Sequence, residues 1–138
     1  MCVIITIKKG VVIVAKIKCV VNLKENDNII FADKRFYGIK TNNKISYQEE
    51  DVIVAIFIND NKILMKRVKE DSKILLEFEE NVCTIGKYFI NNDNLWLPLD
   101  IFTDKILVDD SYMRIAYNIK LDNEPTKFLF EIRYEVEQ

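Results

Sequence analysis

Apolar and polar residues alternate along most of this chain, and the alternation is clearest in residues 126–136. In that stretch one parity carries the apolar residues Phe128, Phe130, Ile132, Tyr134 and Val136. The other parity is charged, with Leu129 as the exception. A period of two is what a β-strand shows when one face packs on a core and the other meets water. We therefore predict a strand here with an apolar inner face.

The same alternation recurs in about ten to eleven short stretches, separated by turn-forming residues at intervals of about 8–12 positions. Residues 95–101 and 103–108 are two such stretches, and each alternates on its own. Residues 52–58 are apolar at nearly every position, which predicts either a strand buried on both faces or one whose outer face another segment covers. No stretch has a sustained period of 3.6 with helix caps, so little or no helix is expected.

The N-terminal stretch is apolar, but lysines at positions 8, 9, 16 and 18 interrupt it. A membrane-spanning helix needs about 18–20 nearly uncharged apolar residues, and a signal peptide needs an unbroken apolar segment. We therefore expect two strands, over residues 3–8 and 11–23, joined by a turn at residues 9–10. The segment predicts neither membrane insertion nor secretion.

Short connections make consecutive strands antiparallel neighbours, so the sequence predicts an up-and-down meander rather than a Greek key. A meander of this many strands exposes two edges unless it closes on itself, so we favour a barrel. The chain has 138 residues, the usual length of one domain. Residues 1–138 are therefore expected to form a single all-β domain, an antiparallel up-and-down β-barrel.

Composition narrows the classes of function. The net charge is −2 and the isoelectric point is about 5.3, which argues against nucleic-acid binding because such domains usually carry a clear basic excess. There is no histidine, and three cysteines stand at unrelated spacings, so neither a zinc site nor a cofactor is expected. An odd number of cysteines suits a reducing cytoplasm, and Cys19 and Cys83 are interpreted as small core residues.

Catalytic patterns are missing from the sequence. Without histidine, the common Ser/His/Asp and Cys/His arrangements cannot form, and no glycine-rich phosphate loop is present. The acidic groups at residues 49–51, 79–80 and 109–110 lie in expected turns, where solvated charge is the ordinary state. We therefore expect no metal site and no enzyme.

The order of several short motifs resembles the YwiB-like family of bacterial β-barrel proteins. The resemblance covers nearly the whole chain and rests on Phe36-Tyr37, residues 44–49, 60–67 and 74–80, Tyr88, residues 97–99, 103–105, 113–121 and 128–136. This chain departs from the family pattern at residues 90–94, where a Thr-Pro-Tyr-Gly turn is common, and after Arg67, where Ser-Gly is usual. The resemblance implies a calycin (lipocalin-like) barrel and implies no particular activity.

A barrel interior is the remaining candidate for a ligand site, because small barrels are either filled by side chains or hold one small ligand. Arg67 shares the parity of Ile63 and Met65, so it is a candidate to point inward and bind a carboxylate as a two-pronged fork. If instead Leu64 and Val68 face inward, Arg67 is solvated. The strand is apolar on both parities and leaves the two alternatives open.

Three aromatic residues complete the candidate ligand site. Tyr117 and Tyr134 fall on the apolar faces of their strands and would either line a pocket or pack in the core with their hydroxyl groups satisfied. Trp96 lies opposite the apolar face of its stretch and would either cap the barrel mouth or mark a partner surface.

Two functions follow from this architecture. The first is a cytoplasmic protein that binds a small, partly apolar ligand inside the barrel. The alternative is a non-enzymatic structural or interaction module with a filled barrel, acting through its outer surface or as a homodimer, with residues 52–58 as a contact strand. Neither a membrane nor a nucleic acid is expected as a partner. The large aromatic residues of the closing strand favour a filled interior.

Overall fold

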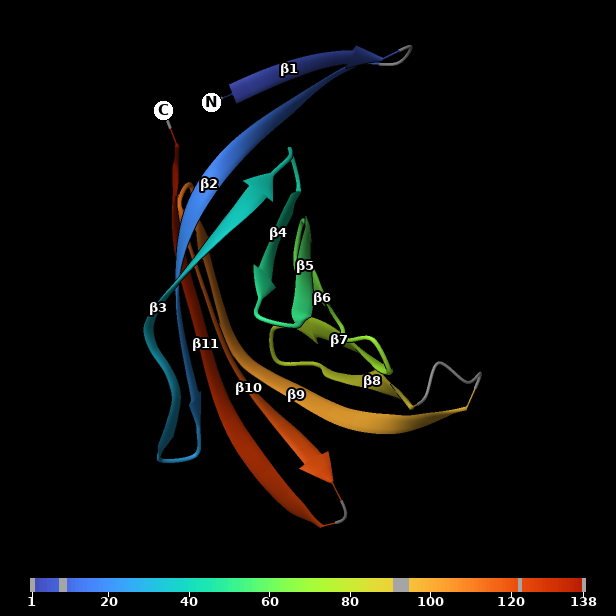
Figure 1. The fold of residues 1–138 in the computed structure, drawn as a ribbon. Coiled ribbons are helices and arrows are strands. Elements are labelled where there is room, and N and C mark those ends of the chain that lie inside the picture. The colour runs from blue at the N-terminus through green and yellow to red at the C-terminus, as the bar shows by residue number, and fades with distance from the viewer. Residues whose placement is uncertain (1, 8–9, 91–94, 122, 138) are drawn as a thin grey trace.

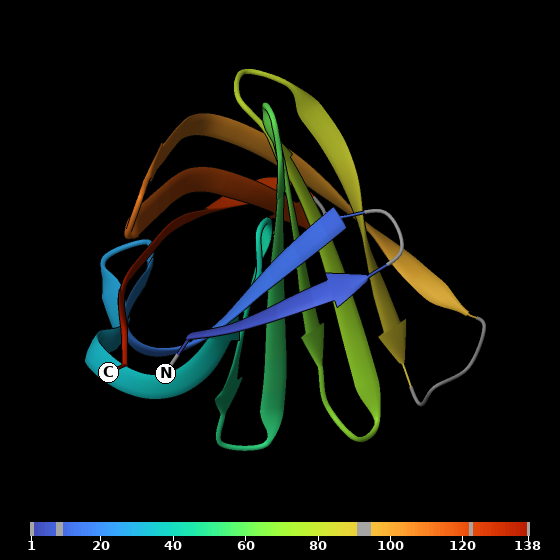
Figure 2. The same cartoon turned by 90° about the horizontal axis from the view of Figure 1, so that it is seen from above.

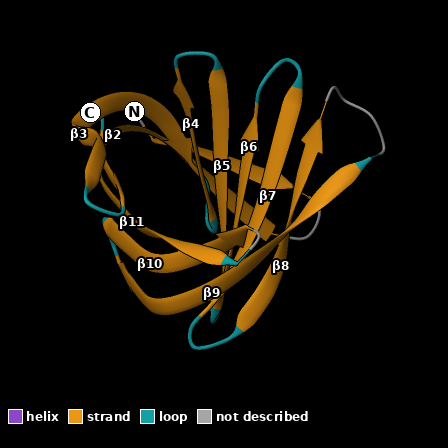
Figure 3. Cartoon of the chain, turned by 90° about the horizontal axis from the view of Figure 1, so that it is seen from below, coloured by secondary structure: helices purple, strands orange, loops and turns teal. Residues whose placement is uncertain are grey.

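The computed structural model describes residues 2–7, 10–90, 95–121 and 123–137. Within these ranges every regular element is a β-strand (Figure 3), and there is no helix long and apolar enough to cross a membrane. The strands are β1 (Cys2–Ile7), β2 (Gly10–Glu25), β3 (Asn28–Lys40), β4 (Lys44–Glu49), β5 (Val52–Asn59), β6 (Lys62–Val68), β7 (Ser72–Glu79), β8 (Cys83–Ile90), β9 (Trp96–Asp109), β10 (Tyr112–Leu121) and β11 (Glu124–Val136).

Strands β2 to β11 form a closed antiparallel barrel of ten strands, in which consecutive strands are neighbours (Figures 1 and 2). Closure depends on β2, which is 16 residues long. One side of β2 pairs with β3, while the other side pairs with β11 and, beyond the end of β11, with β1. The predicted all-β up-and-down barrel is therefore confirmed, with β1 paired to β2 outside the ring.

The inward parity of each strand builds one continuous core. Residues that are at most 1% exposed come from both halves of the barrel and include Ile17, Ile56, Phe78, Ile115 and Ile132. Half-buried apolar residues such as Phe31, Tyr88 and Phe128 pack against this cluster. The alternation of residues 126–136 is confirmed, because Phe130, Ile132 and Tyr134 are buried there.

Strand β9 unites two stretches that the sequence predicted as separate strands. The pairing of β9 with β10 shifts between Ala116 and Tyr117, which face Lys105 and Thr103 respectively, so that Asp104 has no partner in the register. Such an extra residue is a β-bulge, and it reverses the alternation of inward and outward side chains. The interruption of the pattern therefore marks a bend within one strand and not its end.

Strand β5 is neither buried on both faces nor covered on its outer face by another segment, so both alternatives predicted for residues 52–58 are wrong. Val54 and Ile56 are fully buried, but Ile53 on the opposite parity is 54% exposed. Apolar residues on both faces therefore reflect a core face and an open apolar outer face. The predicted turn at residues 9–10 falls partly outside the described residues.

Consecutive turns lie at alternate ends of the barrel, because neighbouring strands run in opposite directions. The turns after β2, β4 and β6 lie at one end, together with the last residues of β8 and β10, and we call it the Arg67 end. The turns after β3, β5, β7 and β9 share the other, which we call the Tyr134 end. Each candidate side chain can be placed relative to these two ends.

Candidate functional site

Arg67 points into the barrel near its Arg67 end. It pairs across the strands with Val54 and Ile74, and Val54 is fully buried. Leu64, on the other parity of β6, is 39% exposed. The inward alternative for Arg67 is therefore the one that the structure adopts, and 23% of its side chain remains exposed.

The guanidinium fork of Arg67 is occupied by Glu49. Its Nη2 lies 2.6 Å from Oε1 of Glu49 and its Nη1 lies 3.4 Å from Oε2. The expectation that residues 49–51 form a solvated acidic turn is thus wrong for Glu49, whose side chain is only 5% exposed. Glu49 continues the inward parity of β4 from Ile45 and Tyr47, so it is the last residue of a strand face and not a turn residue.

Tyr47 extends this cluster. Its hydroxyl donates a hydrogen bond of 3.2 Å to Oε2 of Glu49, and its ring stacks on Phe36 with centroids 5.4 Å apart. Burial and then the neighbouring Glu49 carboxylate raise the pKa of Tyr47 well above its ordinary value. The cluster is therefore a neutral tyrosine and an ion pair that satisfy one another, without a base free for catalysis.

Tyr117 is a core residue in an aromatic column. Its ring stacks on that of Phe128, with ring centroids 5.2 Å apart, and packs against that of Phe78, with ring centroids 4.6 Å apart. Burial raises the pKa of its hydroxyl. Arg67 is close enough to affect that pKa electrostatically, so these two predicted site residues lie in the same part of the interior.

Thr103 is fully buried in the same interior, and its Oγ1 has no hydrogen-bond partner among the described residues. A buried hydroxyl without a partner costs about 1–3 kcal/mol of desolvation. We expect Thr103→Val, which replaces the hydroxyl by a methyl group of similar shape, to raise the free energy of unfolding by about 1 kcal/mol. Urea denaturation would measure the change.

Thr84→Val is the matched control, because the Thr84 hydroxyl donates a hydrogen bond to the backbone oxygen of Glu77. Losing that bond is expected to lower the free energy of unfolding by about 1 kcal/mol. If both substitutions destabilise the protein equally, the Thr103 hydroxyl is satisfied in solution and the expectation is wrong.

Tyr134 lies at the opposite end of the barrel from Arg67. Its hydroxyl donates a hydrogen bond of 2.8 Å to the backbone oxygen of Asp110 in the β9–β10 turn. Burial, with a further contribution from Asp110, raises its pKa. Tyr134 therefore stabilises the β9–β10 turn at the Tyr134 end and does not form one site with Arg67 and Tyr117.

The two cysteines that sequence analysis placed in the core have different environments. Cys19 is 1% exposed, and burial raises the pKa of its thiol to about 12, so it stays protonated at neutral pH. Cys83 is exposed, and the core expectation for it is wrong. Thr84 pairs with Ile101, which points inward, so Thr84 points inward as well. The adjacent Cys83 therefore points outward.

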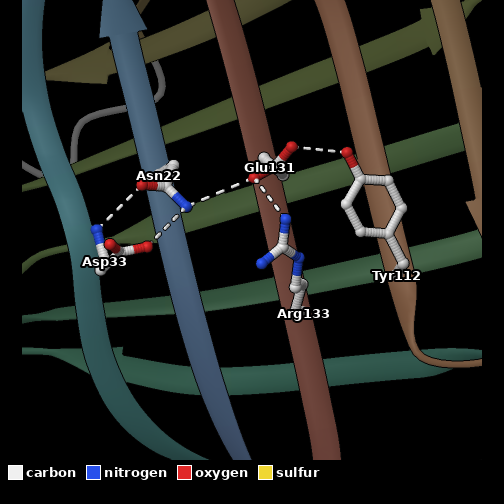
Figure 4. Close-up of polar contacts among 5 residues, drawn as sticks. All are labelled: Asn22, Asp33, Tyr112, Glu131 and Arg133. Carbon is white, nitrogen blue, oxygen red and sulfur yellow. Dashed lines mark hydrogen bonds and ion pairs between the residues drawn. The ribbon is translucent and has the colours of Figure 1, made fainter.

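The outer face of β3, β2, β11 and β10 carries polar groups that satisfy one another (Figure 4). Asn22 accepts a hydrogen bond of 2.8 Å from the backbone N–H of Asp33 and donates one of 3.3 Å to Glu131. Glu131 also accepts a bond of 2.5 Å from the Tyr112 hydroxyl and lies 3.8 Å from Arg133. A groove of about 580 Å³ adjoins this network and is lined mainly by outward residues such as Lys18, Arg35 and Arg133. Its three cations, Lys18, Arg35 and Arg133, are balanced by Glu135 in the groove and by Asp33 and Glu131 in the adjoining network.

A second outer surface has a different character. We call it the basic wall and define it as the outward-facing side chains of β4 to β8 together with Trp96 at the start of β9. Its larger apolar residues are Ile53, Phe57, Leu64, Leu75, Ile85, Phe89 and Trp96. Its charged residues are Lys44, Lys62, Lys66, Lys73, Lys87, Glu77 and Glu79. Five lysines against two glutamates give this surface a charge of +3 in a chain whose net charge is −2.

Three lysines of the basic wall lie over aromatic rings. Lys44 Nζ is 5.2 Å from the ring centroid of Phe57, Lys73 Nζ is 4.6 Å from that of Phe89, and Lys87 Nζ is 4.8 Å from that of Trp96. Trp96 is 42% exposed and pairs with Phe89 across the strands. Of the two predicted roles, a cap on the barrel mouth or a partner surface, its position on the outer wall agrees with the second.

Sequence analysis missed the basic wall as a unit. The five lysines stand on four different strands, and only the pairing register shows that Lys66 and Lys87 flank Leu75 in one row. The sequence contained one sign of such a surface, because residues 52–58 are apolar on both parities and one parity must face outward. Cross-strand rows depend on register, which a single strand does not specify.

No family model and no curated protein matches the sequence. Among solved structures, the crystal structure of the YwiB protein from Bacillus subtilis is similar, with a TM-score of 0.64 and 19% sequence identity over 91% of this chain and 94% of that one. At this level of identity the similarity supports the fold alone. It agrees with the β-barrel that the sequence resemblance implied.

Proposed function

We propose that the protein is a non-enzymatic interaction module with a filled barrel, which binds an anionic, partly apolar partner through its basic wall. The observation that carries this proposal is the +3 charge of the wall, combined with exposed Ile53, Leu64 and Trp96. Exposed apolar surface that is contiguous and bordered by polar groups is typical of interaction sites. The added lysines select for negative charge.

Binding of a small apolar ligand inside the barrel is the less favoured function. The fork of Arg67, which would hold a ligand carboxylate, is already bound to Glu49. The aromatic column of Phe78, Tyr117 and Phe128 occupies the interior beside it. A ligand would have to displace both groups, and it would leave the Glu49 carboxylate buried without its counter-charge, which is costly.

The anionic fluorophore 8-anilinonaphthalene-1-sulfonate tests which surface binds, because it is both apolar and negatively charged. We expect its fluorescence to increase with the native protein, and we expect the double variant Lys66→Glu/Lys87→Glu to abolish most of that increase. Tyr117→Phe, an interior change, is expected to leave the titration unchanged. The titrations are made at neutral pH, and a thermal melt of each variant would establish that it is folded.

Lys105→Glu/Lys120→Glu is the matched control, because it makes the same change of charge at two exposed lysines of β9 and β10, away from the wall. It should bind the fluorophore as the native protein does. If Tyr117→Phe reduces the fluorescence while both lysine variants leave it intact, the interior is the binding site and the proposed function is wrong.

A further inference from the structure

The charges of the basic wall form a band that crosses the strands. Lys66 on β6, Lys73 on β7 and Lys87 on β8 stand within the strands, whereas Lys44 and Lys62 are the first residues of β4 and β6. The turns at the Arg67 end carry acidic residues at positions 50, 51, 70 and 71 beside Lys69, and those at the Tyr134 end carry Asp60 and Glu80. Positive charge is therefore concentrated around Lys66, Lys73 and Lys87, with negative charge at both ends of the strands and on Glu77 and Glu79 toward the Tyr134 end.

The register sets the dimensions of this band. Lys66 faces Leu75 on β7, and Leu75 faces Lys87 on β8, so Lys66 and Lys87 are two strands apart, or about 10 Å. Lys73 stands next to them, one row nearer the Arg67 end. From β4 to β8 the band spans about 19 Å, taking about 4.8 Å between neighbouring strands. Within it β5 carries no lysine, and Lys44 lies one row nearer the Tyr134 end than Lys66.

This distribution of charge discriminates between possible partners. A second copy packed wall to wall would set lysines against lysines, which is unfavourable. A flat anionic membrane would meet the acidic turns at both ends of the strands as well as the lysines. A linear polyanion can follow the band and stay clear of the acidic turns, so it fits the pattern best.

The aromatic residues favour nucleic acid over an acidic peptide. Phe57, Phe89 and Trp96 lie along the band, each with a lysine ammonium group over its ring. Proteins that bind single strands without sequence preference combine a cationic track for the phosphates with aromatic rings on which bases stack. In the basic wall both elements are present at neighbouring positions.

We propose that the basic wall binds single-stranded nucleic acid, with the phosphates along the lysine band and bases stacked at Trp96 and Phe89. The inference rests on the proposed function, in which this wall is the binding surface. The net charge of −2 argued against such a partner, but it averages over the acidic turns and does not describe the wall. The span corresponds to about four nucleotides, the lower end of the range for small barrels.

Trp96 provides a direct test, because it is the only tryptophan of the chain. Titration with a thymidine oligonucleotide of about eight nucleotides is expected to quench its fluorescence at low salt. With about four phosphate contacts, the logarithm of the affinity should fall against the logarithm of salt concentration with a slope of about −3. Lys66→Glu/Lys87→Glu should weaken binding about 100-fold, and Lys105→Glu/Lys120→Glu should leave it within about twofold.

The contribution of base stacking is tested separately by fluorescence anisotropy of a labelled oligonucleotide. Trp96→Ala is expected to weaken binding about tenfold and Trp96→Phe only slightly, since the second keeps a ring. Polyglutamate of equal charge should bind at least tenfold more weakly than the oligonucleotide. Equal affinity for polyglutamate would overturn the inference in favour of an acidic peptide.

The outcomes separate this inference from the proposed function. If the wall binds the anilinonaphthalene fluorophore but no oligonucleotide, the inference is wrong and the proposed function stands. If binding of the fluorophore and binding of the oligonucleotide are both independent of Lys66 and Lys87, the inference and the proposed function are both wrong.

Discussion

Replacing Arg67 with methionine is expected to lower the free energy of unfolding by about 3 kcal/mol, because it leaves the Glu49 carboxylate buried without its counter-charge. Glu49 has only 5% of its side chain exposed, whereas Arg67 has 23%. Loss of Glu49 should therefore cost less than loss of Arg67, since the guanidinium group can still reach water. Urea denaturation of Arg67→Met and Glu49→Gln would measure both effects.

The double variant Glu49→Gln/Arg67→Met distinguishes electrostatics from packing. It removes both charges and keeps an acceptor for the Tyr47 hydroxyl, which donates to Glu49 in the native protein. We expect it to be within about 1 kcal/mol of the native protein, because a buried ion pair contributes little beyond its own desolvation. If the double variant is as unstable as Arg67→Met alone, lost packing of the arginine stem is the cause and the electrostatic explanation fails.

Phe78→Ala is expected to lower the free energy of unfolding by about 3–5 kcal/mol, a large part of the total stability of a typical domain. Phe78 is fully buried, and its ring centroid lies 4.6 Å from that of Tyr117. Removing the ring leaves a cavity between β7 and the aromatic column that a rigid closed barrel cannot collapse to fill. Thermal and urea denaturation would both report the loss.

Phe102→Ala provides the comparison, because Phe102 faces outward from β9 and is 37% exposed. Its removal should cost less than about 1 kcal/mol, as surface substitutions usually do. Similar losses for Phe78→Ala and Phe102→Ala would contradict the assignment of Phe78 to the centre of a single packed core.

The architecture was predictable because the alternation of residues is a local property of each strand. Residues 126–136 show this well, since the period of two correctly predicted which of Phe130, Glu131 and Ile132 would be buried. The bulge at Asp104 was not predictable in the same way. It interrupts the alternation as a loop would, and only the continued pairing with β10 shows that the strand goes on.

The candidate site was less accessible to sequence analysis, because burial at the end of a strand depends on its neighbours. Glu49 looked like part of an acidic turn, and its burial follows from the presence of Arg67 on a strand 18 residues away. The inward parity of Arg67 was one of two alternatives, because β6 is apolar on both faces. The basic wall required the register of five strands, and no single segment carries that information.

The closure of the barrel by β2 and β11 has a consequence for how the protein folds. Most strand pairs join neighbours in the sequence, but Asn22 and Glu131, 109 residues apart, must meet before the ring is complete. Contacts between distant parts of a chain carry a large entropic cost before they stabilise anything, and they slow folding. A circular permutant opened between β6 and β7 would turn this pairing into a local one, so it should fold along a different route to the same barrel.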